Sequence, residues 1–330
     1  MKAICVDIKE AERVKQELVS KGILCKDYKV EREGNFVYFP VLKKYKNYKV
    51  IDVDLKLSEY RLRFEDLAKN ELNKEELEKL KTSYDIVGNI AIVEVDRELR
   101  SKEKKIGEAL LKCNKNIKTV LRRGGSHEGT FRIQKNIFLA GEDKRETLYI
   151  ESGLKIKLNV DEVYFSPRLG NERLRIARLV KPKEKVLVMF SGCGIYPLVI
   201  NKYSKAAKVY GVEINQKAHK YALQNVKLNK LNNIKLFCGD VGEVLPELDI
   251  RFDRIIMPLP KDAIKFLDLV KMVSKEGTVI HLYAFEENFG MIWEEIKKYF
   301  KDINPLNLVK CCQIGPRKYR VCADFEILKK

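Results

Sequence analysis

The sequence has few of the residues that bind metal ions and no apolar run long enough to cross a bilayer. Only three histidines occur, and none of the eight cysteines belongs to a CxxC pair. A zinc site is therefore not expected, and we interpret the cysteines as buried thiols of a reducing compartment. The apolar stretches, such as 279–285, are far shorter than the roughly 20 residues of a membrane helix, and charged residues follow Met1 almost at once. We therefore expect a soluble, cytoplasmic protein with no metal and no membrane segment.

The charge of the sequence is strongly positive. Lys and Arg number 65 against 47 Asp and Glu, which gives a formal net charge of +18, and 45% of the residues are hydrophobic. This hydrophobic content supports a sizeable core and excludes wholesale disorder. A charged fraction of 34% is typical of heat-adapted proteins, but heat adaptation does not explain an excess of cations. The excess favours a polyanionic partner, and nucleic acid is the commonest one.

The 330 residues divide into three stretches of different character. Residues 1–60 predict a small α+β domain, and residues 61–165 predict a charged linker helix followed by a second α+β domain. Residues 166–330 alternate strands with helices, which indicates a doubly wound, mostly parallel sheet. In this third domain we expect strands at 185–190, 208–214, 234–238, 252–257 and 278–285, helices at 195–203, 216–231, 263–273 and 289–300, and a final hairpin of strands 308–314 and 319–328.

A glycine-rich turn follows the first strand of the third domain. This strand leads into Ser191-Gly192-Cys193-Gly194, where glycines let the backbone approach a ligand at the start of a helix. Glu213 ends the next strand, where a carboxylate can accept hydrogen bonds from both hydroxyls of a ribose. Pro197 stands where a dinucleotide fingerprint would have its third glycine. A nucleoside without phosphates, such as S-adenosylmethionine, therefore fits this site better than a dinucleotide.

Two further strand ends favour the same ligand site. Asp240 follows the third strand, where its carboxylate can accept a hydrogen bond from an adenine amino group. Pro258 and Pro260 follow the fourth strand and stiffen its connection to the next helix. In an open α/β sheet, ligands bind at the carboxyl ends of the strands, so these residues are expected at one site.

The stretch Tyr164–Arg173, with sequence YFSPRLGNER, carries a specific resemblance. Together with the glycine turn and the motifs around Glu213, Asp240 and Pro260, it resembles the archaeal and eukaryotic tRNA (guanine-N1)-methyltransferases, which modify guanosine 37. The resemblance runs over essentially the whole chain. It implies a class I (Rossmann-like) S-adenosylmethionine-dependent methyltransferase domain preceded by two smaller α+β domains. It also implies an enzyme that binds the outer corner and the anticodon branch of tRNA. We expect the enzyme to be a monomer.

The resemblance also assigns roles to residues. Glu172 would be the general base, Arg132 would face the guanine carbonyl, and Tyr164 and Pro260 would shape the base pocket. Pro258 stands where family members usually carry Asn or Asp. The S-adenosylmethionine site would comprise Arg173, Phe190, Gly192, Gly194, Glu213, Ile214, Asp240, Val241 and Pro258.

The chemistry of N1 methylation requires these residue types. Guanine N1 carries a proton at neutral pH and is a poor nucleophile until a carboxylate such as Glu172 takes that proton. Loss of the proton moves negative charge onto the adjacent carbonyl oxygen, where a guanidinium such as that of Arg132 stabilises the transition state. No metal ion is required.

Three alternatives remain open at this point. The similarity is to an archaeal branch in which some members also methylate carbon 7 of the tricyclic wyosine precursor made from the same guanosine. A related enzyme transfers the aminocarboxypropyl group of S-adenosylmethionine to that precursor. From a different class, a tRNA-binding protein without catalytic activity would share the fold, although the presence of both Glu172 and Arg132 argues against it.

Overall fold

The computed structural model describes residues 1–25, 27–46, 48–56, 64–125, 133–287, 289–315 and 317–329. These residues form two compact units. The first contains Met1–Asn70 with Lys112–Asn114, and the second contains Glu71–Leu111 with Lys115–Lys330. No helix in the described part of the chain is both long and apolar enough to span a membrane.

The N-terminal unit is a four-stranded antiparallel sheet with one long helix. The strands lie in the order β2-β3-β1-β4, and Ala3 of β1 pairs with Pro40 of β3. The Asp7 carboxylate accepts a hydrogen bond from the backbone N–H of Lys9 and caps the helix, whose Val14 and Leu18 pack into the core. The elements are β1 (Lys2–Asp7), α1 (Ile8–Ser20), β2 (Glu31–Glu33), β3 (Phe36–Pro40), β4 (Val50–Asp52) and α2 (Phe64–Ala68).

The second unit begins with a small mixed sheet of order β5-β6-β7-β8. Its strands β6 and β7 run parallel, and helix α4 lies between them in the chain. The charged linker helix expected at the start of residues 61–165 is short in the structure, where Asn73 caps α3. The elements are α3 (Lys74–Glu78), β5 (Tyr84–Val87), β6 (Ile90–Val93), α4 (Glu103–Cys113), β7 (Thr119–Arg123), β8 (Asn136–Gly141), and the hairpin β9 (Glu146–Glu151) with β10 (Leu154–Asn159).

The remainder of this unit is a seven-stranded sheet of order β13-β12-β11-β14-β15-β17-β16, with β11 to β15 parallel as predicted. Successive residues of β11 enter cores on opposite faces of the sheet, Val186 and Val188 on one and Leu187 and Met189 on the other. The strands are β11 (Lys185–Met189), β12 (Lys208–Glu213), β13 (Ile234–Cys238), β14 (Phe252–Met257), β15 (Ser274–Glu286), β16 (Asp302–Gly315) and β17 (Lys318–Lys329). The helices are α5 (Gly170–Leu179), α6 (Ile195–Tyr203), α7 (Gln216–Leu228), α8 (Val241–Glu247), α9 (Leu267–Val273) and α10 (Ile292–Lys297).

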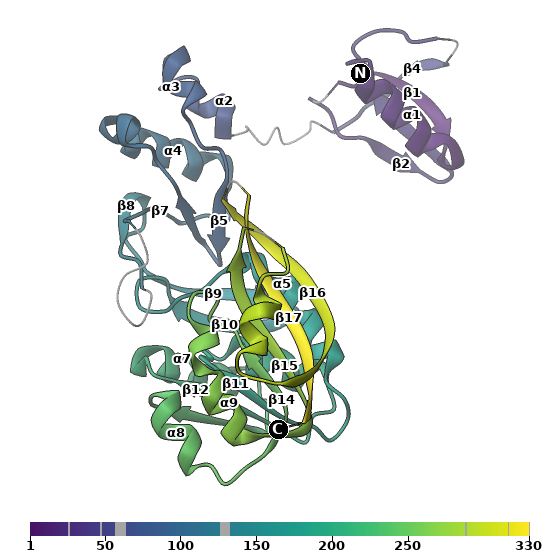
Figure 1. Cartoon of the computed structure of the whole chain (residues 1–330). Helices are drawn as coiled ribbons and strands as arrows, with labels where there is room; N and C mark the ends of the chain where they lie inside the picture. The colour runs from purple at the N-terminus through teal and green to yellow at the C-terminus, as the bar shows by residue number, and fades with distance from the viewer. Residues whose placement is uncertain are drawn as a thin grey trace. The chain divides into compact units, whose positions relative to one another are not determined.

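The C-terminal hairpin is longer than predicted, and it shapes the site. In Figure 1 the yellow strands β16 and β17 run beside β15, to which β17 is antiparallel. The register places Arg320 of β17 opposite Phe285 of β15 on one side and Cys312 of β16 on the other. The hairpin therefore carries an arginine to the carboxyl end of β15, the edge at which ligands bind in such sheets.

Candidate active site

A cavity of about 430 Å³ lies at the carboxyl ends of the parallel strands. The loops after β11, β12 and β14 line it, together with the stretch before α5 and the ends of β15 and β17. Nine residues predicted for the active site lie in its wall, namely Tyr164, Arg173, Phe190, Gly192, Glu213, Ile214, Asp240, Pro258 and Pro260. Topology and motif reading therefore agree on the position of this site.

The turn after β11 has the backbone geometry that its glycines indicate. Gly192 has φ 57° and lines the cavity, while Gly194 has φ 83° and precedes α6. A Cβ atom on Gly194 would lie 3.0 Å from Cβ of Ala222 and 3.1 Å from Cδ1 of Leu198. Gly194 therefore allows α6 to pack closely against α7 and does not line the cavity itself.

Two backbone N–H groups fix the position of the Glu213 carboxylate. The backbone N–H of Gly192 donates to its Oε2 (2.6 Å), and that of Asn215 donates to its Oε1 (2.9 Å). Burial raises the pKa of this carboxyl above its ordinary value, although these two N–H groups act in the opposite direction. Each carboxylate oxygen keeps a second lone pair, so the side chain suits the paired hydroxyls of a ribose. These residues fit the adenosine portion of S-adenosylmethionine.

Replacing Glu213 with Gln should weaken the binding of S-adenosylmethionine about ten-fold, because a charged hydrogen-bond acceptor is lost. In the wild type, affinity should fall as the pH drops from neutral toward the ordinary carboxyl range of about 4 to 5, beginning above that range because the pKa is raised. The variant should lack this part of the pH dependence. Calorimetric titration at several pH values measures both effects, and Asp268→Asn, on the exposed face of α9, is the control. If the affinity for S-adenosylmethionine changed with pH equally in Glu213→Gln and in wild type, the proposed role of Glu213 would be wrong.

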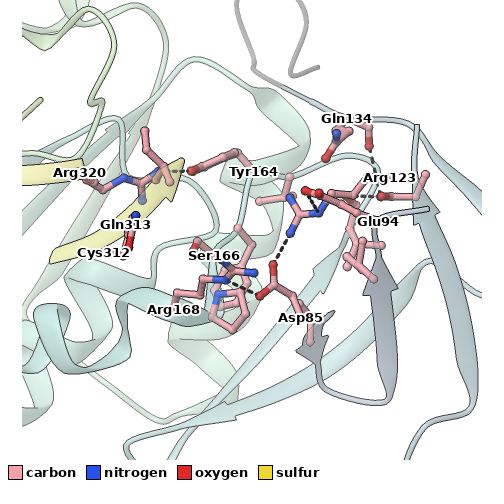
Figure 2. A pocket seen from close by; sticks show the side chains of 18 of the residues that line it. Asp85, Glu94, Arg123, Gln134, Tyr164, Ser166, Arg168, Cys312, Gln313 and Arg320 are labelled. Carbon is pink, nitrogen blue, oxygen red and sulfur yellow. Dashed lines mark hydrogen bonds and ion pairs between the residues drawn. The ribbon is translucent and has the colours of Figure 1, made fainter. Parts of the chain in front are cut away.

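A second cavity, of about 320 Å³, adjoins the first. Figure 2 shows the side chains that line this second cavity. The two cavities share wall residues, which are Tyr164, Phe165, Ser166, Phe285 and Arg320. The far wall belongs to strands β5, β6 and β7 of the small mixed sheet. The two cavities therefore meet along these five residues.

Arg320 and Tyr164 both belong to the shared wall and contact each other. The guanidinium Nη2 of Arg320 donates to the hydroxyl of Tyr164 at 2.6 Å, as Figure 2 shows, and its Cζ lies 5.5 Å from the ring centre of Phe285. On the opposite side of the second cavity, Asp85 accepts hydrogen bonds from Arg123 and from Nε of Arg168. Nε of Arg123 also lies 3.8 Å from Oε1 of Glu94, so these two guanidinium groups face two carboxylates.

Glu172 lies beside the cavities and does not line either of them. It is 6% exposed, and its Oε1 accepts hydrogen bonds from the hydroxyl of Tyr283 (2.7 Å) and from Nη2 of Arg175 (2.8 Å). Its Oε2 accepts from Nε of Arg175 at 2.7 Å and from no other described group. One oxygen of the carboxylate therefore retains a free lone pair.

Arg175 links Glu172 to a buried chain of charged and polar side chains. Its Nη1 donates to Asp324 (2.6 Å), and Asp324 accepts in turn from Nδ1 of His281 (2.6 Å). Because a guanidinium can only donate, the contact of Arg254 with Nε2 of His281 (2.7 Å) fixes the neutral ring with its proton on Nδ1. Burial lowers the pKa of His281, which agrees with this assignment.

This chain also explains a cluster of possible metal ligands. His281, Cys322 and Asp324 place ligand atoms within 4.8 Å of one another, all buried. The ring nitrogens of His281 are engaged by Asp324 and Arg254, and Asp324 is also bound by Arg175. Two guanidinium groups so close by disfavour a cation, so hydrogen bonds account for the cluster without a metal ion.

Three predicted site residues in the described part of the chain are not in the cavity wall. Glu172 and Gly194 are described above, and Val241 is buried at the first turn of α8. Arg132 lies outside the described residues. The sequence analysis did not single out Arg320 or Phe285, because strands β15 and β17 carry no motif and only their pairing brings them to this edge.

The sheet, the glycine turn and the carboxylate at the end of β12 define a class I S-adenosylmethionine-dependent methyltransferase. Three family models match the chain, the tRNA methyltransferase 5 N-terminal domain over residues 3–49, the TYW2 N-terminal domain over 64–144 and the TRM5/TYW2 methyltransferase domain over 147–309. The chain is 37% identical to the tRNA (guanine(37)-N(1))-methyltransferase Trm5b of Pyrococcus abyssi, with 98% of each chain covered. The corresponding enzyme of Methanocaldococcus jannaschii is 35% identical, with 99% of each covered. The chain belongs to the TRM5/TYW2 methyltransferase family.

Solved structures agree with this assignment. The crystal structure of Trm5b from Pyrococcus abyssi superposes with a TM-score of 0.76 at 36% identity and covers 99% of each chain. A complex of aTrm5 with tRNALeu superposes with a TM-score of 0.75 at 32% identity, with 99% of this chain and 100% of that chain covered. TYW2 of Pyrococcus horikoshii, solved with MeSAdo, has a TM-score of 0.66 at 26% identity and covers 82% of this chain and 100% of its own. The predicted family, fold and cofactor are confirmed.

Proposed function

We propose that this enzyme transfers a methyl group from S-adenosylmethionine to N1 of guanosine 37 in tRNA. The observation that carries the proposal is the pair of adjoining cavities, one suited to a nucleoside and the other open beside it, in a chain related over its whole length to enzymes of that name. A methyl donor in the first cavity and a flipped base in the second would meet at the wall that contains Tyr164 and Arg320.

Glu172 takes the N1 proton in this proposal. Bound S-adenosylmethionine supplies an electrophilic methyl group on a sulfonium centre. The hydrogen bonds from Arg175 and Tyr283 fix the carboxylate, and the free lone pair on Oε2 is available to the proton. Arg132 stabilises the charge that develops on the guanine carbonyl oxygen, as the family motif implies. Tyr164 and Pro260 shape the base pocket, and the remaining predicted residues hold the donor.

The partner in this proposal is tRNA, in agreement with the net charge of +18 and with the tRNA complex of a related structure. The N-terminal domain grips the outer corner of the tRNA, and the middle and catalytic domains hold its anticodon branch. The enzyme acts as a monomer in the cytoplasm and needs no metal ion.

A second substrate deserves a test because of a particular relative. The tRNA (guanine(37)-N(1))/4-demethylwyosine(37)-methyltransferase Taw22 of Nanoarchaeum equitans is 33% identical over 74% of this chain. Carbon 7 of the tricyclic precursor is therefore a candidate second acceptor. The aminocarboxypropyltransferase of Pyrococcus horikoshii is more distant, at 29% identity over 81% of the chain.

The test is methyl transfer from radiolabelled S-adenosylmethionine to unmodified tRNA transcripts that carry G or A at position 37, with the modified nucleoside identified by mass. We expect N1-methylguanosine on the G transcript alone. A third tRNA carrying the tricyclic precursor tests the second substrate and distinguishes methyl from aminocarboxypropyl transfer. Absence of label from the G transcript would refute the proposed function.

A further inference from the structure

A buried ion pair joins the hairpin β9–β10 to helix α5 beside the cofactor cavity. Nε of Arg173 donates to Oε1 of Glu151 at 2.7 Å, and Nη2 of Arg173 donates to Oε2 at 2.5 Å. Arg173 is 2% exposed and Glu151 is 7% exposed. Two parallel hydrogen bonds of this kind fix both the position and the plane of a guanidinium. Arg173 lines the cofactor cavity, and Glu151 lies behind it, outside the wall.

The other neighbours of Arg173 leave one of its nitrogens available. The carbonyl oxygen of Ser166 accepts from Nη2 (3.1 Å), and Cζ lies 5.4 Å from the ring centre of Phe165 and 6.0 Å from that of Tyr196. Aromatic rings attract a guanidinium, so these contacts also hold it in place. Nη1 donates to no group in the described part of the chain, and it is not fully enclosed. Because Arg173 lines the cofactor cavity, Nη1 can donate to a ligand there.

Gly170, in the YFSPRLGNER stretch, belongs to the same arrangement. It begins α5 with φ −57° and ψ −48°, a conformation that any residue can adopt. A Cβ atom on Gly170 would lie 3.0 Å from Oε2 of Glu151 and 3.3 Å from its Cδ. The backbone conformation therefore does not require glycine here, but the space that the Glu151 carboxylate occupies does.

The order of the strands indicates which part of the methyl donor lies near Arg173. The adenine is expected at Asp240 after β13, and the ribose at Glu213 at the end of β12. The sheet order β13-β12-β11 continues this line to the turn after β11. Gly192 of that turn lies beside the stretch before α5, since its Cβ would be 3.9 Å from the carbonyl oxygen of Tyr164. The amino acid portion of the donor therefore extends toward this side of the cavity.

Arg173 is the best placed of the cations in this wall. Of the described residues, Lys261 and Arg320 also line the cavity. Lys261 is exposed, and Arg320 already donates to the hydroxyl of Tyr164. Arg173 is fixed before the ligand arrives, so its side chain loses little conformational freedom on binding.

We propose that Glu151 is a positioning residue of the methyl-donor site, which holds Arg173 so that Nη1 donates to the carboxylate of the amino acid portion of S-adenosylmethionine. Glu151 occupies Nε and Nη2, so the planar guanidinium presents its remaining nitrogen to the donor. Glu151 acts through Arg173 and does not itself contact the ligand. The inference concerns the donor alone and does not depend on which nucleoside accepts the methyl group.

The experiment compares two ligands that differ only by a carboxylate, namely S-adenosylhomocysteine and 5′-deoxy-5′-(3-aminopropylthio)adenosine. Calorimetric titration gives the affinity for each. We expect wild type to bind S-adenosylhomocysteine at least about ten-fold more tightly, the range for a hydrogen bond to a charged group. Glu151→Asp keeps the charge but draws the carboxylate back by one methylene, so Arg173 is no longer held in place. The preference should then fall below about three-fold, with the affinity for the decarboxylated ligand nearly unchanged.

Gly170→Ala tests the same contact from helix α5. The added methyl group crowds the carboxylate of Glu151, and alanine is the most favourable residue in a helix. The preference for S-adenosylhomocysteine should narrow as in Glu151→Asp. Tyr149→Phe is the matched control, because the Tyr149 hydroxyl donates to Oε2 of Glu151 at 3.3 Å and its loss leaves both hydrogen bonds to Arg173. This variant should keep the wild-type preference.

The affinity for the decarboxylated ligand shows whether each variant still forms the cavity. If wild type bound both ligands equally, or if Glu151→Asp and Gly170→Ala kept the wild-type preference, the inference would be wrong. A loss of both affinities by the same factor in Glu151→Asp would mean that Glu151 only supports the fold, and it would also overturn the inference. The proposed function is tested by methyl transfer to tRNA, a different measurement, so either proposal can fail without the other.

Discussion

Replacing Glu172 with Gln should lower the turnover number on tRNA by at least about a hundred-fold, the range expected when a general base is lost. Gln is nearly the same size and can still accept a hydrogen bond, but it cannot take the proton from N1. Because the defect lies in the chemical step, the affinity for tRNA should change only a few-fold. Single-turnover rates and tRNA affinity, measured on the same preparations, give both quantities.

Tyr283→Phe is the matched control for this prediction. It removes one hydrogen bond from Oε1 of Glu172 and leaves the carboxylate bound by Arg175. We expect a loss of less than about ten-fold, because two hydrogen bonds from Arg175 still hold the carboxylate and the base remains. If Glu172→Gln kept more than a tenth of the wild-type rate and Tyr283→Phe were slower than Glu172→Gln, Glu172 would not be the general base.

Replacing Asp324 with Asn should lower the free energy of unfolding by about 3–5 kcal/mol, the usual cost of removing one partner from a buried ion pair. Asp324 is 3% exposed and accepts hydrogen bonds from both Arg175 and His281. An amide group there would turn a donor toward one of these donors and leave the Arg175 charge uncompensated. Urea unfolding at neutral pH measures the change, and Asp268→Asn, which breaks an exposed pair with Lys271, should cost under about 1 kcal/mol.

The same carboxylate gives a pH signature. Burial alone would raise the pKa of Asp324, but the hydrogen bonds from His281 and Arg175 outweigh it and hold the pKa well below the ordinary value. A carboxyl whose pKa is depressed in the folded state stabilises the fold above its unfolded pKa of about 3.9 and loses that effect as the pH falls through the folded value. Wild-type stability should therefore decline more steeply than that of Asp324→Asn below about pH 4. Parallel declines would contradict the assignment.

The sequence predicted the elements whose signals are local. Strands β13 and β14 and helix α6 have the predicted bounds, because each is a short apolar run between clear turn residues. Helix α4 was missed, although Ile106, Ala109 and Leu110 mark its buried face, because charged residues surround them. The bounds of the three predicted domains stay predictions.

The site was predictable to the extent that it depends on strand ends. Residues that follow β11, β12, β13 and β14 lie together because parallel strands present their carboxyl ends at one edge. The surroundings of Glu172 were not predictable. Arg175 connects Glu172 to Asp324, and Asp324 comes 149 residues after Arg175 in the sequence. The sequence also could not show that one side-chain atom each of Asn136 and Arg320 lacks a hydrogen-bond partner among the described residues, because hydrogen bonding between distant residues depends on the folded structure.

The wall of the second cavity is assembled from both ends of the unit, with Asp85 on β5 and Arg320 on β17. Most of the cofactor cavity, in contrast, comes from the stretch between Tyr164 and Phe266. The second cavity therefore exists only where the first strands of the unit and its last strand are both in place, while most residues of the cofactor wall come from one continuous stretch.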